Sequence, residues 1–251
     1  MLRPIYNLHN HTPFSDGAYT IDEVAEAHVS HEELDIAGIG ICDHLFCTPS
    51  SREPSDARDF ERIFAGETRR YVEAVHEARD RWAGKLDIVC GCEINWPMNK
   101  AYFDVIRKML DGIDYVLFEY LDWAALTQLA NQARHWPCPV GLAHADVTVQ
   151  FPNTSADQVV RTLANARIFY EINSKFLPLH ENDKWFNLLP NHRVSITLGT
   201  DTHDDLSCID DLKTMHAYAV ARGLEQKLFV PRLRENEADA AESQLAAQTR
   251  P

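Results

Sequence analysis

The chain has 251 residues, of which 45% are hydrophobic and 25% are charged, and its formal net charge is −14. These values are typical of one globular domain with a substantial core, and no apolar run approaches the roughly 18 residues that a membrane span needs. The acidic balance argues against a groove for long nucleic acids, because such grooves bind phosphates through Lys and Arg. A small phosphorylated substrate remains compatible, since two or three bound divalent cations would offset roughly four to six negative charges locally.

The six cysteines show no zinc-finger spacing, and the N-terminal residues do not form a signal-peptide pattern. We therefore expect reduced, mostly buried thiols in a cytoplasmic protein.

Short apolar segments rich in β-branched residues alternate with longer amphipathic segments along the chain. The predicted strands are 4–11, 35–44, 86–95, 114–121, 139–146, 167–174 and 193–203. The predicted helices are 20–34, 55–83, 98–111, 124–136, 155–166, 181–189 and 207–222. This alternation indicates parallel strands joined by right-handed crossovers. It predicts an α/β fold in one domain, a distorted seven-stranded (β/α)7 barrel of the TIM-barrel-like type.

Two further features bear on the organisation of the domain. The sequence contains neither G-x-G-x-x-G after the first strand nor a Walker A motif, so we expect no loop that cradles a nucleotide phosphate. The barrel is predicted over residues 1–232, and the polar, Ala-rich residues 233–251 are predicted to form a frayed helix or a disordered tail.

Residues that can bind metal ions recur where the predicted strands end, which is where parallel barrels place their active sites. His9 and His11 are two residues apart and therefore share one face of the first strand, and Asp16 follows in the next loop. The same pattern recurs on the second, third, fifth and seventh strands. The candidate ligands are His9, His11, Asp16, His44, Glu93, His144, Asp201 and His203.

Imidazoles mixed with carboxylates, without cysteine, suit Zn²⁺, Mn²⁺ or Fe²⁺ better than Ca²⁺. One ion takes about four ligands, so eight candidates imply at least two ions, with Glu93 or Asp201 placed to bridge them. Two-metal centres activate water and bind both the attacking and the leaving oxygen of a phosphoryl group.

Five motifs resemble the successive motifs of the PHP (polymerase and histidinol phosphatase) family in order and spacing. They are HNHTPFSDG (9–17), CDH (42–44), GCE (91–93), LAHAD (142–146) and GTDTH (199–203). The resemblance extends to the seventh predicted strand. It implies a distorted seven-stranded barrel, a centre of two or three divalent metal ions, and metal-dependent hydrolysis of phosphate esters. By position, the eight candidate ligands correspond to the metal ligands of the family.

The fourth predicted strand departs from the family pattern. In trinuclear members this strand supplies a further histidine, whereas here it reads DYVLFEYLDW (114–123). Either Glu119 serves as a ligand instead, or Leu121 occupies the place of the histidine and one metal is bound weakly or not at all.

These observations predict a phosphoesterase in which a metal-activated hydroxide attacks the phosphate ester of a small molecule or nucleotide. The candidates for the proton donor to the leaving group are Asp16, Asp146 and His203. The alternatives are a nuclease acting on short oligonucleotides, a metal-dependent amidohydrolase and a non-catalytic metal-binding barrel.

Substrate contacts are predicted from two loops at the same end of the barrel. The candidates are Asn173 and Lys175 in YEINSK (170–175), and Arg52 in the loop after the second strand. We expect a small phosphorylated substrate and neither a membrane nor a long nucleic acid as partner. The sequence leaves the oligomeric state open.

Overall fold

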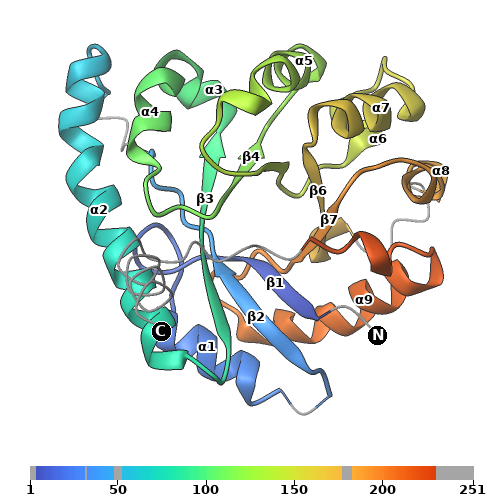
Figure 1. Cartoon of the computed structure of the whole chain (residues 1–251), viewed down its shortest axis with the longest axis horizontal. Helices are drawn as coiled ribbons and strands as arrows, with labels where there is room; N and C mark the ends of the chain where they lie inside the picture. Colours follow the sequence, from blue (N-terminus) through green and yellow to red (C-terminus); the bar gives the residue numbers. More distant parts are fainter. Residues whose placement is uncertain (1–3, 32, 48–52, 177–182, 230–251) are drawn as a thin grey trace, which may run out of the picture.

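A computed structural model describes residues 4–31, 33–47, 53–176 and 183–229. Within these residues, seven parallel strands form a closed barrel in the order of the sequence (Figure 1). This confirms the predicted α/β barrel. The strands are β1 (Ile5–Asn10), β2 (Ile36–Ile41), β3 (Asp87–Asn95), β4 (Tyr115–Glu119), β5 (Val140–Leu142), β6 (Phe169–Asn173) and β7 (Ile196–Gly199).

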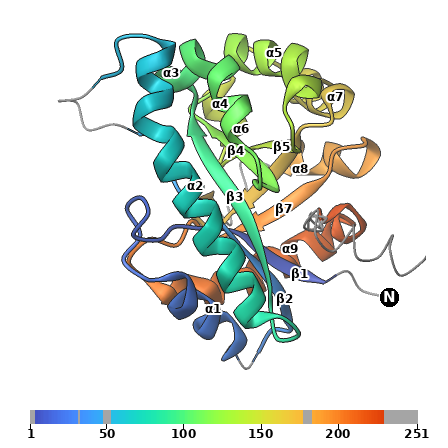
Figure 2. The same cartoon turned by 60° about the vertical axis from the view of Figure 1, so that its left-hand side comes forward.

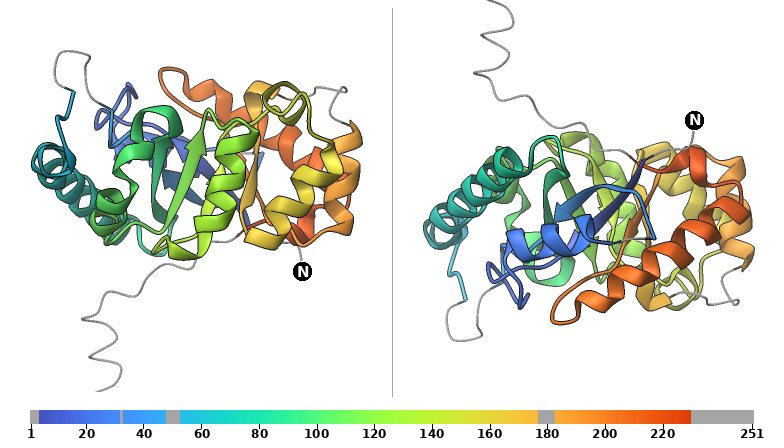
Figure 3. Two further views of the ribbon diagram at one scale, coloured as in Figure 1. Left: turned by 90° about the horizontal axis from the view of Figure 1, so that it is seen from above. Right: turned by 90° about the horizontal axis from the view of Figure 1, so that it is seen from below.

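Helices surround the barrel, as the views from above and below show (Figure 3). The α-helices are α1 (Ile21–Val29), α2 (Ala57–Trp82), α3 (Trp96–Asn99), α4 (Phe103–Met109), α5 (Trp123–Gln132), α6 (Val147–Gln150), α7 (Ala156–Ala166), α8 (Asp183–Leu188) and α9 (Asp211–Ala221). Short 3₁₀ turns are η1 (Lys100–Tyr102), η2 (Ala133–His135), η3 (Ser174–Phe176), η5 (Leu189–Asn191), η6 (Leu206–Asp210) and η7 (Glu225–Lys227).

Helix α1 begins where the sequence predicted it. The Thr20 side chain accepts a hydrogen bond from the Glu23 backbone N–H, and the Glu23 carboxylate accepts one from the Thr20 N–H. This capping box satisfies two donors that the first turn would otherwise leave free.

The long helix α2 packs along β3 (Figure 2). Its buried residues recur at helical spacing, and they include Phe60, Phe64 and Tyr71. The Tyr71 hydroxyl lies 2.8 Å from the carbonyl oxygens of both Ile41 and Gly91, so the helix is fixed against β2 and β3 together.

Tyr115 fills the barrel interior beneath the mouth. Its hydroxyl donates to the Leu8 carbonyl at 2.6 Å, which links β4 to β1 across the barrel. The ring fits because β3 carries Gly91, where a Cβ atom would lie 2.4 Å from the ring carbon Cζ. The interior is therefore a packed core, and the space for chemistry lies at the C-terminal ends of the strands.

The ladder between β1 and β7 closes the barrel and is short, with Asn7 and Leu198 as its single register pair. An isolated bridge between Asn10 and Thr202 continues it. The Asn7 side chain adds two contacts, since its amide lies 2.8 Å from Thr200 Oγ1 and its carbonyl accepts from the Thr200 N–H.

The structure also corrects several predicted boundaries. Strand β5 ends at Leu142 instead of continuing to residue 146, because His144 has φ 25°, in a region that strands do not use. The predicted helix 98–111 is divided into α3, η1 and α4, and the short helix α6 was not predicted. Arg52 and the predicted tail 233–251 lie outside the described residues.

Two further observations concern membrane-spanning helices and the state of the cysteines. Among the described residues, no helix is long and apolar enough to cross a membrane. The six cysteines are free thiols, and four of them are buried: Cys42, Cys90, Cys92 and Cys138.

Candidate metal centre

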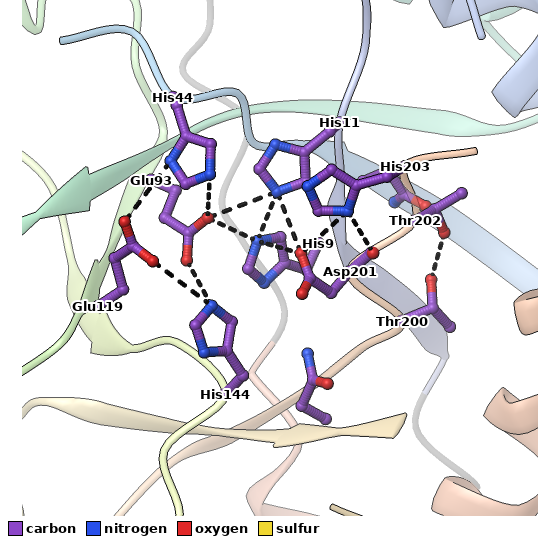
Figure 4. A network of polar contacts seen from close by, with 12 residues as sticks. His9, His11, His44, Glu93, Glu119, His144, Thr200, Asp201, Thr202 and His203 are labelled. Atoms are coloured by element: carbon purple, nitrogen blue, oxygen red, sulfur yellow. Dashed lines mark hydrogen bonds and ion pairs between the residues drawn. The ribbon is translucent and has the colours of Figure 1, made fainter. Parts of the chain in front are cut away.

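The predicted ligands converge at the mouth of the barrel, and Figure 4 labels all of them except Asp16. His9 lies in β1 and His11 directly after it, Glu93 lies in β3, and Glu119 ends β4. Asp16 lies in the loop after β1, His44 follows β2, His144 follows β5, and Asp201 and His203 follow β7. Three overlapping groups of these side chains have ligand atoms within 4.8 Å of one another.

The central group consists of His9, His11, Glu93 and Asp201, all buried. The two histidine Nε2 atoms lie 3.0 Å apart. Glu93 Oε2 and Asp201 Oδ1 each lie between 3.2 and 3.4 Å from both nitrogens. Four ligands placed tetrahedrally at about 2.0–2.1 Å from a zinc ion lie about 3.3–3.4 Å from one another, so this group has the dimensions of a metal site.

The second group lies nearer the solvent and contains His11, Asp16, His44 and His203. Asp16 Oδ1 lies 3.4 Å from His11 Nδ1, and Asp16 Oδ2 lies 3.5 Å from His203 Nε2. His203 Nδ1 donates to the Asp201 carbonyl at 2.8 Å, which leaves Nε2 free to act as a ligand. The His203 ring stacks on that of His11 with centroids 4.1 Å apart.

The third group contains His44, Glu93 and Glu119, with His144 beside it. Glu93 Oε2 lies 3.3 Å from His44 Nε2, and its Oε1 lies 2.9 Å from His144 Nε2. Glu119 lies 3.8 Å from His44 and 3.9 Å from His144. Leu121 is buried in the hydrophobic core, so it is Glu119 that β4 contributes to this cluster.

Opposite charges stabilise one another within the central group. Burial opposes ionisation of Glu93, but His9 and His11 outweigh it and hold the pKa of this carboxyl well below its usual range. Burial also opposes ionisation of Asp201, but His9 and His11 outweigh it and lower the pKa of this carboxyl. Burial also opposes the charge on His11, yet hydrogen bonds to Asp201 and Glu93 raise its pKa to about 9. In the absence of a cation, protons on these imidazoles neutralise the carboxylates.

The pKa of Glu119 is shifted in the opposite direction. Burial and the nearby Glu93 carboxylate raise its pKa to about 7. A carboxyl group with a raised pKa becomes an effective ligand when a cation replaces its proton.

Two buried carboxylates, Asp43 and Glu171, hold the candidate ligands in place from behind the cluster. The spacing of the candidate ligands in the sequence did not identify them. Asp43 accepts hydrogen bonds from Thr12 N and Thr12 Oγ1 at 2.8 and 2.7 Å, and from Ser15 Oγ at 2.5 Å, which fixes the loop between His11 and Asp16. Glu171 accepts from His9 Nδ1 at 2.8 Å. Glu171 could have been recognised, because it is two residues before Asn173 and so shares its face of the sixth strand.

The proton-donor candidates differ in their surroundings. Asp16 and His203 belong to the second group. Asp146 is the N-cap of α6, where its Oδ1 accepts from Thr148 N at 2.9 Å and from Thr148 Oγ1 at 2.7 Å. Its carboxylate is thus engaged in local structure.

Of the substrate-binding candidates, Lys175 forms an ion pair with Asp201 at the mouth. Asn173 accepts from the Lys175 N–H at 2.9 Å, and its buried Nδ2 has no hydrogen-bond partner among the described residues. The position of Arg52 is not described.

A closed parallel barrel that gathers histidines and carboxylates at the C-terminal ends of its strands defines a class, the barrel metallohydrolases. The family profile described as PHP domain matches residues 7–175, and the chain belongs to the PHP family. This confirms the resemblance found in the motifs and the enzyme class expected from it, a metal-dependent phosphoric ester hydrolase.

Two solved structures share the fold. Histidinol phosphate phosphatase from Lactococcus lactis subsp. lactis, solved with zinc, L-histidinol and phosphate, has a TM-score of 0.57 and 16% identity, covering 86% of this chain and 93% of its own. A chain of archaeal ribonuclease P with mature tRNA has a TM-score of 0.51 and 15% identity, covering 90% and 86%. At these identities the likeness concerns the fold. No curated protein sequence matches the chain.

Proposed function

We propose that this protein hydrolyses the phosphate ester of a small molecule or nucleotide at a centre of two or three divalent cations in the barrel mouth. The observation that carries the proposal is the central group, in which two imidazole nitrogens lie 3.0 Å apart and each lies 3.2–3.4 Å from two carboxylate oxygens, and all four residues are buried.

The donor set fits such cations. Glu93 Oε1 and Asp201 Oδ1 are buried. The nitrogens nearest to them are themselves candidate ligands, with His144 Nε2 2.9 Å from Glu93 Oε1 and His11 Nε2 3.2 Å from Asp201 Oδ1. A cation that replaces the imidazole protons can therefore bind both oxygens. Histidine nitrogens with carboxylate oxygens suit Zn²⁺, Mn²⁺ or Fe²⁺. When bound, the cations supply Lewis acidity, which activates water as the nucleophile and neutralises charge on the non-bridging phosphate oxygens.

A third cation would lie in the group of His44, Glu93, Glu119 and His144. Glu93 directs its two oxygens toward different histidines, which suits a carboxylate that bridges two ions. Glu119 faces both His44 and His144, so it is suited to the role that a histidine of the fourth strand has in trinuclear members.

Lys175 and Asn173 are proposed to hold the substrate phosphate. The Lys175 ammonium group is half-exposed beside Asp201, and the Asn173 amide offers an unused donor. Charge-assisted hydrogen bonds from such donors orient a phosphate and select for its charge. Arg52 remains a further candidate.

Proton delivery to the leaving group is assigned to whichever of Asp16 and His203 is left uncoordinated when a cation binds the second group. Their facing atoms lie 3.5 Å apart, and the two side chains are 56% and 28% exposed, so both can reach solvent. Asp146 is less suited, because its carboxylate caps α6.

The test is an activity screen of the metal-loaded and chelator-treated protein. The substrates are phosphomonoesters including L-histidinol phosphate, mononucleotides, short oligonucleotides and amides, each with added Mn²⁺ or Zn²⁺. We expect phosphate release that chelation abolishes and metal restores. Full activity in the metal-stripped protein would contradict the proposal. Cleavage of oligonucleotides or amides alone would favour those alternatives, and inertness with metal fully bound would favour a binding role.

A further inference from the structure

Glu171, in the middle of β6, is a buried carboxylate that contacts two predicted ligands from different strands. Its Oε1 accepts a hydrogen bond from His9 Nδ1 at 2.8 Å. Its Oε2 accepts one from the backbone N–H of His144 at 2.5 Å. Glu171 is only 1% exposed, so solvent does not compete for either bond.

The barrel makes room for this carboxylate at one position. A Cβ atom at Gly199 in β7 would lie 1.9 Å from Glu171 Oε1 and 2.8 Å from His9 Cβ. Glycine is thus required at residue 199 to allow the Glu171–His9 contact, because any side chain there would displace one of the two groups.

The second contact supports an unusual backbone conformation. His144 has φ 25°, a backbone conformation that non-glycine residues rarely adopt. The hydrogen bond from its N–H to Glu171 holds the backbone where the imidazole reaches Glu93 Oε1 at 2.9 Å.

We propose that Glu171 is a positioning residue that fixes both His9 and His144 for metal binding. The inference rests on the proposed function insofar as the cluster is taken to bind divalent cations. A carboxylate accepts hydrogen bonds and donates none, so it selects the His9 tautomer with the proton on Nδ1. That tautomer leaves the lone pair of Nε2 directed at His11, Glu93 and Asp201. Groups that orient ligands in this way typically contribute 10–100-fold to metal affinity.

The variant Glu171→Gln tests this with almost no change in shape. Both partners of the carboxylate are donors, and an amide has only one acceptor atom. If its oxygen faces His144 N–H, its NH₂ group faces His9 Nδ1, which must then give up its proton, so that Nε2 becomes protonated and unavailable. If its oxygen faces His9, its NH₂ group opposes the His144 N–H. Zinc affinity, measured by competition with a chromophoric chelator, should fall by about 10–100-fold.

Asp114→Asn provides a matched control. Asp114 is also a buried carboxylate, and its Oδ2 accepts hydrogen bonds from Arg79 Nη2 at 2.5 Å and from Cys90 N at 2.9 Å, but it precedes β4 at the opposite end of the barrel. Its replacement should lower stability while leaving zinc affinity within about twofold. An equal loss of affinity in both variants would reduce the role of Glu171 to general stability and overturn the proposal.

Two further measurements are independent of activity. Long-range ¹H–¹⁵N NMR of the zinc-loaded protein should show His9 protonated at Nδ1, and this pattern should be lost in Glu171→Gln. Gly199→Ala, which expels the carboxylate from the other side, should reproduce the loss of affinity. Unchanged zinc affinity in Glu171→Gln, with His9 still protonated at Nδ1, would overturn the inference. If wild-type protein shows both signatures but hydrolyses no phosphate ester, the proposed function fails while the role of Glu171 stands.

Discussion

His9 and His11 approach each other with their Nε2 atoms 3.0 Å apart inside the barrel mouth, although both side chains are fully buried. At most one proton can lie between two such nitrogens, and both also face Glu93 and Asp201. A divalent cation satisfies all four groups at once, which makes the pair the most direct point at which to test the centre.

His9→Ala should therefore lose the central cation and catalytic activity. We expect activity to fall by at least about 100-fold, because removing groups that only orient ligands already costs 10–100-fold. Metal content by mass spectrometry and phosphate release are measured together, with circular dichroism to show that the barrel remains folded. Wild-type metal occupancy in a folded His9→Ala protein would contradict the assignment of His9.

Glu119 is expected to set the number of cations. Glu119→Gln should lower the metal content by about one ion per chain at limiting metal, because an amide is a weaker ligand than a carboxylate for these ions. Glu119→His, which introduces the ligand type of trinuclear family members, should keep the third ion. If all three proteins bind the same number of ions in a titration, Glu119 is not a ligand.

Lys175→Gln should weaken substrate binding more than it affects metal binding. Loss of a hydrogen bond to a charged group costs about 1.5–3 kcal/mol, which corresponds to roughly a 10–100-fold decrease in kcat/KM, mainly through KM. Metal content must remain unchanged, since Lys175 also contacts Asp201. Lys213→Gln is the control, because Lys213 pairs with Glu33 on the exposed surface. An unaltered KM in Lys175→Gln would exclude the proposed phosphate contact.

His28 predicts a pH dependence of stability that is separate from the metal centre. It is buried, its Nδ1–H donates to the Val24 carbonyl, and its Nε2 accepts from Asn7. Burial lowers the pKa of His28 to about 4. The unfolded chain therefore binds more protons between about pH 6.5 and pH 4, and stability is lost as the pH falls through this window.

The size of this effect is measurable by urea denaturation with chelator present. Relative to His28→Gln, which cannot titrate, the wild-type protein should lose about 2 kcal/mol of unfolding free energy between pH 7 and pH 5. Parallel pH profiles for the two proteins would show that His28 makes no such contribution.

The barrel could be predicted from sequence because short apolar segments alternate with longer amphipathic ones, which is typical of parallel strands joined by helices. The pairs His9/His11 and Asp201/His203 have the two-residue spacing of one strand face, and they pointed to the correct end of the fold. Glu119 was identifiable because it ends the fourth predicted strand, which supplies a histidine in trinuclear members of the family. These features are local, so periodicity is enough to locate them.

Other features depend on contacts between strands, which spacing does not contain. Glu171 and Asp43 act through neighbours far away in the chain. The positive φ angles of His144 and Asp201 arise from tertiary packing and shortened the strands relative to their apolar patterns. Asp146 had the sequence of a helix N-cap, followed by Thr148, but its place after a strand favoured a catalytic interpretation.

The short ladder between β1 and β7 has a consequence for how the protein opens. His9 lies in β1 and Asp201 lies two residues after the end of β7. A cation in the central group therefore cross-links the first and last strands of the barrel where their backbone pairing is sparse. A bound metal ion should then stabilise the pairing of β1 with β7. We expect amide exchange along β1 and β7 to be slow in the metal-loaded protein and to accelerate selectively after chelation. This result would show that unfolding begins between these two strands.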